Sequence, residues 1–185
     1  IELEVRMAVK IVRVLNTNAV VSSDQEGREL IITGAGIGFK KKKGENLDEA
    51  LADKTYYLES VDDSRRLQEV VKEISEEYLE IVSRIVKTAR EEGLKVRDSL
   101  YVTLTDHINS AVDRYRENIA LKNMMKLEIR KFYPKEYEIG LRAVQWIQEQ
   151  NDENLGEDEA AFIAMHIVSA ELGSGSNVDV NKITK

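Results

Sequence analysis

Residues 10–33 read KIVRVLNTNAVVSSDQEGRELIIT. Runs rich in Val, Ile and Leu alternate here with turn residues, and the turn at 24–27 between two such runs is typical of a β-hairpin. A similar run, KTYYLES, follows at residues 54–60. The pattern predicts a small antiparallel β-sheet. Because about fifty residues give only a marginal core, we expect this sheet to pair with a second copy in a homodimer.

The apolar period changes after Ser60 from two residues to about 3.6, which indicates helices. Apolar stripes cover 67–74 and 78–86, and further helices are expected at 98–118, 123–132, 135–150 and 157–172. The fold class is therefore predicted as α+β and multi-domain, a small antiparallel sheet followed by an all-α helical bundle. The expected domains are 7–60 and 61–172, with a linker or tail at 173–185. Residues 1–6 precede a methionine that could be the natural start, so nothing is based on them.

Composition excludes several classes of protein. The chain of 185 residues has no cysteine, so disulfides, thiolate metal sites and cysteine nucleophiles are excluded. Without a membrane-length apolar run or a cleavable leader, we expect a cytoplasmic protein. The net charge of −7 argues against a protein that coats nucleic acid by charge alone. Residues 7–58 carry 8 Lys and Arg against 7 Asp and Glu, so the acidity belongs to the remainder.

The string ITGAGIGFKKKKG, residues 32–44, combines three alternating glycines with an aromatic residue and a lysine run. Glycine permits positive φ angles or a close backbone approach. Phe39 could stack on an unpaired base while Lys40 and its neighbours neutralise phosphates, which suits RNA loops. A dinucleotide-binding loop is disfavoured because no helix start follows the glycines. A glycine-kinked strand with a solvated lysine face remains an alternative.

Three polar residues in RVLNTN, namely Arg13, Asn16 and Asn18, lie at the turn between the first two expected strands. Asparagine commonly fills turns for local reasons, and by itself this interpretation is favoured. An asparagine amide can also pair with a base edge through its donor and acceptor together. The sequence leaves both roles open.

The chain has two histidines, His107 in TLTDHINSA and His166 in AAFIAMHIVSAEL. A buried structural histidine is the ordinary explanation on such apolar helix faces. Imidazole can, however, accept a phosphoryl group from another protein at cellular pH. A metal site with Asp106 or Glu159 has no short-range ligand pair in its favour. With no GxSxG elbow either, we expect no enzyme and no cofactor.

Several strings resemble one known family in the correct order, from residue 9 to about 172. VLNTNAVV and LIITGAGIGFKKKKG look like the RNA-binding co-antiterminator domain of the bacterial BglG/SacY/LicT transcriptional antiterminators. SLYVTLTDHINSAVDR, FYPKEYEIG and EDEAAFIAMHIVSAEL resemble that family's first regulation domain, PRD1, which the sugar phosphotransferase system controls.

The resemblance implies a homodimer that binds an RNA hairpin in the leader of a sugar-utilisation message and prevents terminator formation. It also implies phosphorylation of His107 and His166 by phosphotransferase-system proteins, the phosphocarrier HPr and a sugar-specific enzyme II. The family normally carries a second regulation domain, which this sequence lacks, so its regulation is expected to be incomplete or its activity constitutive. Position 35 is alanine where some relatives have arginine, which puts RNA specificity in doubt. The expected RNA-contacting positions are Arg13, Asn16, Asn18, Gly34, Gly36, Phe39 and Lys40.

Two other classes of function stay open at this point. A protein-interaction module would use the helical part to bind a partner and the sheet only to dimerise. A DNA-binding protein is less well supported, because no expected helix begins with basic residues suited to a major groove.

Overall fold

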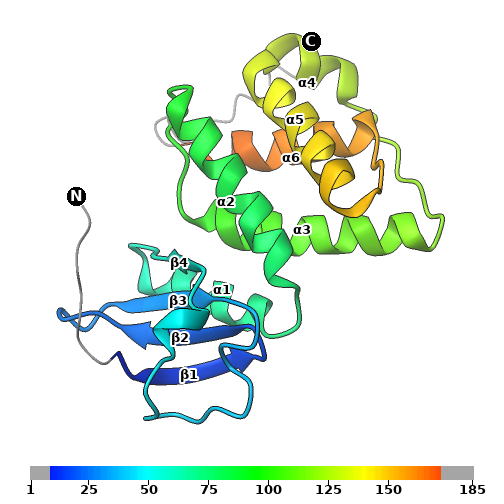
Figure 1. Cartoon of the computed structure of the whole chain (residues 1–185). Helices are drawn as coiled ribbons and strands as arrows, with labels where there is room; N and C mark the ends of the chain where they lie inside the picture. The colour runs from blue at the N-terminus through cyan, green and yellow to red at the C-terminus, as the bar shows by residue number, and fades with distance from the viewer. Residues whose placement is uncertain (1–8, 172–185) are drawn as a thin grey trace. The chain divides into compact units, whose positions relative to one another are not determined.

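The computed structural model describes residues 9–171. The chain divides into two compact units, and the boundary in the sequence falls between Glu76 and Glu77. The expected sections 1–6 and 173–185 lie outside the described residues. Figure 1 shows a sheet in the first unit and a set of helices in the second. The predicted α+β fold class is confirmed. The first unit includes a helix beyond Ser60, while the functional limits 7–60 and 61–172 stay predictions.

Within the described residues, the sheet of the first unit has four antiparallel strands in the order β1-β2-β3-β4. The strands are β1 (Ile11–Asn16), β2 (Ala19–Ser23), β3 (Glu29–Thr33) and β4 (Lys54–Tyr56). The predicted hairpin turn is confirmed: Gly27 has a φ of 78°, and the Asp24 carboxylate accepts from the backbone N–H groups of Glu26 and Arg28. The last expected strand is shorter than KTYYLES and ends at Tyr56.

Both faces of this sheet are covered. On one face, Ile37 from the segment after β3 packs with Ile11, Val20 and Ile32 in a buried cluster. The opposite face is covered by α1 (Val61–Val71), which begins at the N-cap Ser60 and contacts β1 and β3. Leu67 and Val71 of α1 are almost fully buried. Strands β1 to β3 therefore lie between α1 and the loop after β3.

The described residues of the second unit form five helices, as the 3.6-residue period predicts. The helix α6 contacts α3, α4 and α5 and so forms the centre of the bundle. Gly140 of α5 permits its closest approach to α6, because a Cβ there would lie 2.2 Å from the Ala160 carbonyl oxygen. The helices are α2 (Glu76–Glu91), α3 (Ser99–Arg116), α4 (Lys126–Phe132), α5 (Pro134–Asn151) and α6 (Glu157–Ala170).

Candidate functional site

The glycine and lysine segment forms a loop of consecutive turns rather than the glycine-kinked strand that was the alternative. Backbone hydrogen bonds join Ile37 N to Gly34 O and Phe39 N to Gly36 O. A Cβ on Gly34 would lie 1.8 Å from the Leu51 carbonyl oxygen, and one on Gly38 would lie 2.2 Å from that of Asn16. Gly36 instead has a φ of 76° with open space around it. Glycine is therefore required at positions 34 and 38 because other backbone comes so close, and at position 36 because φ is positive there.

The two asparagines of the β1–β2 turn hold this loop in place. The Asn18 side-chain oxygen accepts a hydrogen bond from Gly36 N at 2.9 Å, and its backbone oxygen accepts from Gly34 N at 3.0 Å. The Asn16 side-chain oxygen accepts from Asn18 N at 2.7 Å. Four predicted RNA-contacting positions are thus joined in one hydrogen-bonded cluster. Both asparagines have the local turn role that the sequence favoured.

Phe39 lies at the outer side of the loop with 58% of its surface exposed. The Lys40 ammonium lies 5.3 Å from the centroid of the Phe39 ring, and Lys40 itself has a φ of 55° in the left-handed region. An exposed ring beside a cation is the arrangement that stacks on an unpaired base and binds its phosphate.

Arg13 lies apart from that ring, on the sheet face that α1 covers. Its guanidinium pairs with the Glu29 carboxylate and donates a further hydrogen bond to Gln68 at 3.3 Å. Arg65 of α1 pairs with the same carboxylate at 2.6 Å. Burial raises the pKa of Glu29, but hydrogen bonds from Arg13, Gln68 and Arg65 outweigh it and lower the pKa overall. The charge of Arg13 is therefore balanced within the unit.

The side-chain amides of Asn16 and Asn18 also donate hydrogen bonds to the last residues of the first unit. Asn16 Nδ2 donates to the Val71 carbonyl oxygen at 2.8 Å, at the last residue of α1. Asn18 Nδ2 donates to the Glu76 carboxylate at 3.1 Å. Any base contact by these amides would have to replace hydrogen bonds that are already made.

The second unit brings the two histidines together, although they are far apart in sequence. The ring centroids of His107 on α3 and His166 on α6 lie 4.7 Å apart, and Phe162 lies 5.9 Å from His107. Burial, and then the charge of His107, lower the pKa of His166 to about 4. Its ring is therefore neutral near pH 7, as a phosphoryl acceptor requires.

Glu159 and Arg114 complete the histidine cluster. His107 Nε2 lies 2.9 Å from Glu159 Oε2, and Arg114 donates to Glu159 Oε1 at 3.1 Å. Burial raises the pKa of Glu159, but the hydrogen bonds and charges of His107 and Arg114 outweigh it and lower the pKa overall. Glu159 is thus an ionised carboxylate held between an imidazole and a guanidinium.

The sequence suggests Glu159 only as a candidate metal ligand, and it does not single out Arg114 or Glu29. The signal for the first two was present, since Arg114 follows His107 by seven residues and Glu159 precedes His166 by seven. Seven residues are two helical turns, so each pair lies on one helix face. Within residues 9–171, no group of three or more His, Asp or Glu side chains is arranged to hold a metal ion.

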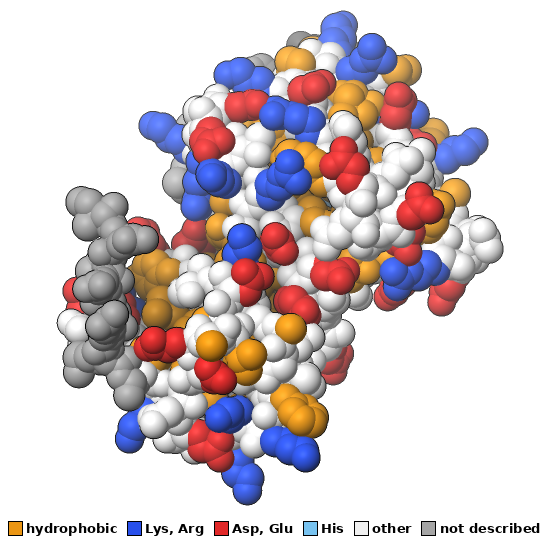
Figure 2. All heavy atoms as spheres, viewed as in Figure 1, with side chains coloured by type: hydrophobic (Ala, Val, Ile, Leu, Met, Phe, Trp, Pro, Cys, Tyr) orange, Lys and Arg blue, Asp and Glu red, His pale blue; other side chains and the backbone are white. Residues whose placement is uncertain are grey.

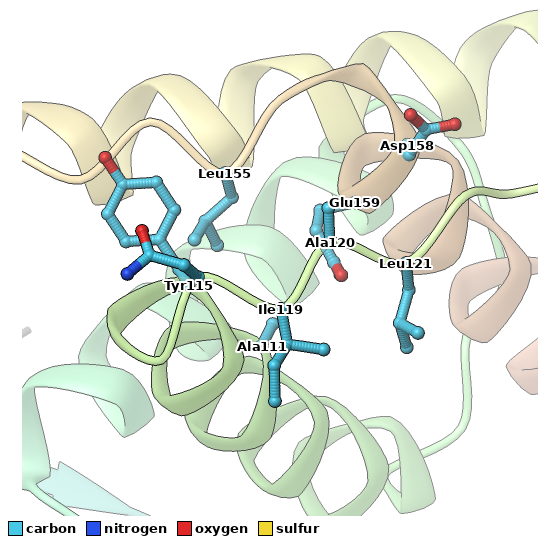
Figure 3. Close-up of a pocket in the computed structure, with 9 residues that line it drawn as sticks. Ala111, Tyr115, Ile119, Ala120, Leu121, Leu155, Asp158 and Glu159 are labelled. Carbon is cyan, nitrogen blue, oxygen red and sulfur yellow. The ribbon is translucent and has the colours of Figure 1, made fainter.

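Beside Glu159 lies a hollow of about 290 Å³ that Figure 3 shows from close up. Ile119 and Leu121, from the segment after α3, line it and remain nearly half exposed. On the face drawn in Figure 2, basic and acidic side chains are interspersed. No helix in the described part of the chain is long and apolar enough to cross a membrane.

Both units match domain families of known proteins. Residues 9–65 match the family model of the CAT RNA binding domain, and residues 79–170 match the PRD domain. The chain is 38% identical over 167 residues to the beta-glucoside operon antiterminator of Dickeya chrysanthemi. It is 38% identical over 165 residues to the transcription antiterminator LicT of Bacillus subtilis (strain 168). These alignments cover 90% and 89% of the chain but only 59% and 60% of the two relatives.

A crystal structure of GlcT CAT-PRDI is similar in fold, with a TM-score of 0.70 and 28% sequence identity. The similarity covers 88% of this chain and 97% of the GlcT chain. The sheet unit and the helical unit therefore occur in the same order in a solved relative.

Proposed function

Since the chain belongs to the BglG/SacY/LicT family of transcriptional antiterminators, with a CAT RNA binding domain and a PRD domain, we propose that it binds an RNA hairpin in the leader of a sugar-utilisation message. Binding prevents an overlapping terminator from forming. The chain spans about 60% of the length of the curated relatives it matches, so this activity is proposed for the part that is present.

One observation carries the RNA-binding proposal: the exposed Phe39 and Lys40 stand on a loop that Asn18 holds by two hydrogen bonds. Because the loop backbone is already held in place, little backbone freedom is lost when a base stacks on the ring. The glycines supply bare backbone that can enter a narrow groove. Since residue 35 is an exposed alanine, this loop offers no arginine side chain between Gly34 and Gly36.

The regulatory part of the proposal concerns His107 and His166. Phosphorylation of either ring would add negative charge next to the ionised Glu159 and would disturb the packing of α3 on α6. The proposed donors are the phosphocarrier HPr and a sugar-specific enzyme II. We further propose that the protein acts as a homodimer in the cytoplasm and catalyses no reaction of its own.

The most informative experiment is selection of bound RNA from a transcript pool, followed by footprinting on the whole chain. A leader hairpin overlapping a terminator is the expected ligand. Recovery of no structured RNA, or of duplex without loops or bulges, would contradict the proposal. A parallel reaction with phosphorylated HPr tests for acid-labile phosphate on the histidines.

A further inference from the structure

We propose that Glu159 holds His107 as its Nε2–H tautomer and thereby directs phosphoryl transfer to Nδ1 of His107. This inference rests on the proposed control by histidine phosphorylation. To that proposal it adds the atom of His107 that reacts and the residue that positions the His107 ring.

The geometry fixes one end of the His107 ring. Nε2 lies 2.9 Å from Glu159 Oε2, while the other carboxylate oxygen accepts from Arg114 at 3.1 Å. The side chain of Glu159 is 9% exposed, so water has little access to these bonds. Both oxygens of the carboxylate are thus in use, one by each partner.

The direction of the hydrogen bond follows from the charge of Glu159. An ionised carboxylate can only accept hydrogen bonds, so the nitrogen facing it must carry a proton. The partners of Glu159 lower its pKa overall, which keeps it ionised at neutral pH. Neutral imidazole carries one proton, and with that proton on Nε2 the free lone pair is on Nδ1.

The transfer then balances in atoms and charge. The Nδ1 lone pair attacks the phosphorus of a phosphohistidine donor, and the phosphorus–nitrogen bond of the donor breaks. The donor ring, protonated at its other nitrogen, regains that electron pair and leaves as neutral imidazole. The His107 ring becomes an Nδ1-phosphorylated imidazolium whose Nε2–H still faces Glu159. A carboxylate in this place stabilises the positive ring, as it does for the histidine of a hydrolase triad.

Glu159 is therefore a positioning residue, because it acts through His107 and does not touch the phosphoryl group. The two histidines differ in this respect. His107 pairs with Glu159, while the His166 ring lies against the His107 ring, tilted by 50° to it. Arg114 holds Glu159 in place through the second oxygen.

The test uses the whole chain with ¹⁵N-labelled histidine. Nitrogen chemical shifts report the tautomer of unphosphorylated His107, and HPr phosphorylated from phosphoenolpyruvate then serves as donor. Alkaline hydrolysis and chromatography of the His107 peptide separate the Nδ1 from the Nε2 phosphohistidine. The variants are Glu159→Gln, whose amide can donate as well as accept, and the control Glu153→Gln. Glu153 pairs with Arg116 of α3 at 2.7 Å but does not contact a histidine.

We expect the Nε2–H tautomer and the Nδ1 phosphate in the native chain and in Glu153→Gln. In Glu159→Gln we expect a mixture of tautomers and roughly tenfold slower labelling of His107, on the scale of a lost hydrogen bond to a charged group. An Nδ1–H tautomer, an Nε2 phosphate, or no phosphate on His107 would each overturn the inference. Label on His166 alone would overturn it while preserving the proposed function. Absence of label on both histidines would count against the phosphorylation half of that function as well.

Discussion

Arg13 on β1 forms an ion pair with Glu29 on β3, although β2 lies between their strands in the sheet. The two side chains meet on the face that α1 covers, where Gln68 of α1 contacts both. Arg13 is one of the positions expected to contact RNA. A phosphate that binds Arg13 must therefore compete with a carboxylate that is already in place.

This competition predicts the effect of Glu29→Gln. The variant removes the negative charge but keeps a hydrogen-bond acceptor for Arg13 and Arg65, so RNA should bind more tightly and with a steeper salt dependence. One additional phosphate contact corresponds to a change of about 0.7 to 0.9 in the logarithmic salt slope. Binding titrations of the leader hairpin at several salt concentrations measure it. Glu26→Gln is the control, because Glu26 is an exposed partner of Arg28 in the same hairpin. Equal slopes for both variants would show that Arg13 does not reach a phosphate.

Phe39→Ala should weaken hairpin binding without unfolding the protein, since the ring is mostly exposed. Loss of one stacked base costs about 1–3 kcal/mol, or roughly 5- to 150-fold in affinity. Gel-shift titration gives the affinity, and thermal unfolding checks the fold. Tyr57→Ala is a matched control, because Tyr57 is also exposed and has Arg28 at 5.1 Å from its ring centroid. Equal losses in both variants would argue against a specific stacking role for Phe39.

Gly38→Ala should damage the loop far more than Gly36→Ala. A Cβ at position 38 would lie 2.2 Å from the Asn16 backbone oxygen, so the turn and the loop must move apart. At position 36 a Cβ meets open space, and the cost is that of the left-handed conformation, about 1–2 kcal/mol. Chemical denaturation with hairpin binding measures both effects. The opposite order of destabilisation would mean that the loop does not pack on the β1–β2 turn.

The parts of this fold that the sequence predicts are those whose pattern is local. The β-rich runs and the turn at 24–27 predict the strands, and the 3.6-residue period predicts the helices. The loop at 34–44 differed from the strand alternative because its geometry depends on partners distant in sequence. Gly34 lies against Leu51, and Gly38 lies against Asn16.

The candidate sites show the same division. His107 and His166 were identified from their strings, but nothing local indicates that α3 and α6 bring their rings together. The pairing of Arg13 with Glu29 likewise depends on sheet order and on α1. Charged partners such as Glu29 and Arg114 occur among many solvated charges, so only tertiary contact distinguishes them.

A partly buried carboxyl group directly after α6, that of Glu171, predicts a pH dependence of stability. Burial first, and then a hydrogen bond and charge repulsion from Glu136, raise the pKa of Glu171 to about 8 from an ordinary value of 4.5. The folded state therefore holds a proton that the unfolded state releases above about pH 4.5. Stability from this group is full below that pH and is lost as the pH rises to about 8.

Glu171→Gln should abolish this loss, because an amide can donate a hydrogen bond to Glu136 without taking up a proton. We expect the melting temperature of the native chain to fall relative to the variant between about pH 5 and pH 8, and the two curves to run parallel above that range. Calorimetry over this range measures the difference. Glu149→Gln, an exposed substitution on α5, controls for the loss of one negative charge. If the control gave the same difference, net charge rather than the Glu136–Glu171 contact would explain the pH dependence.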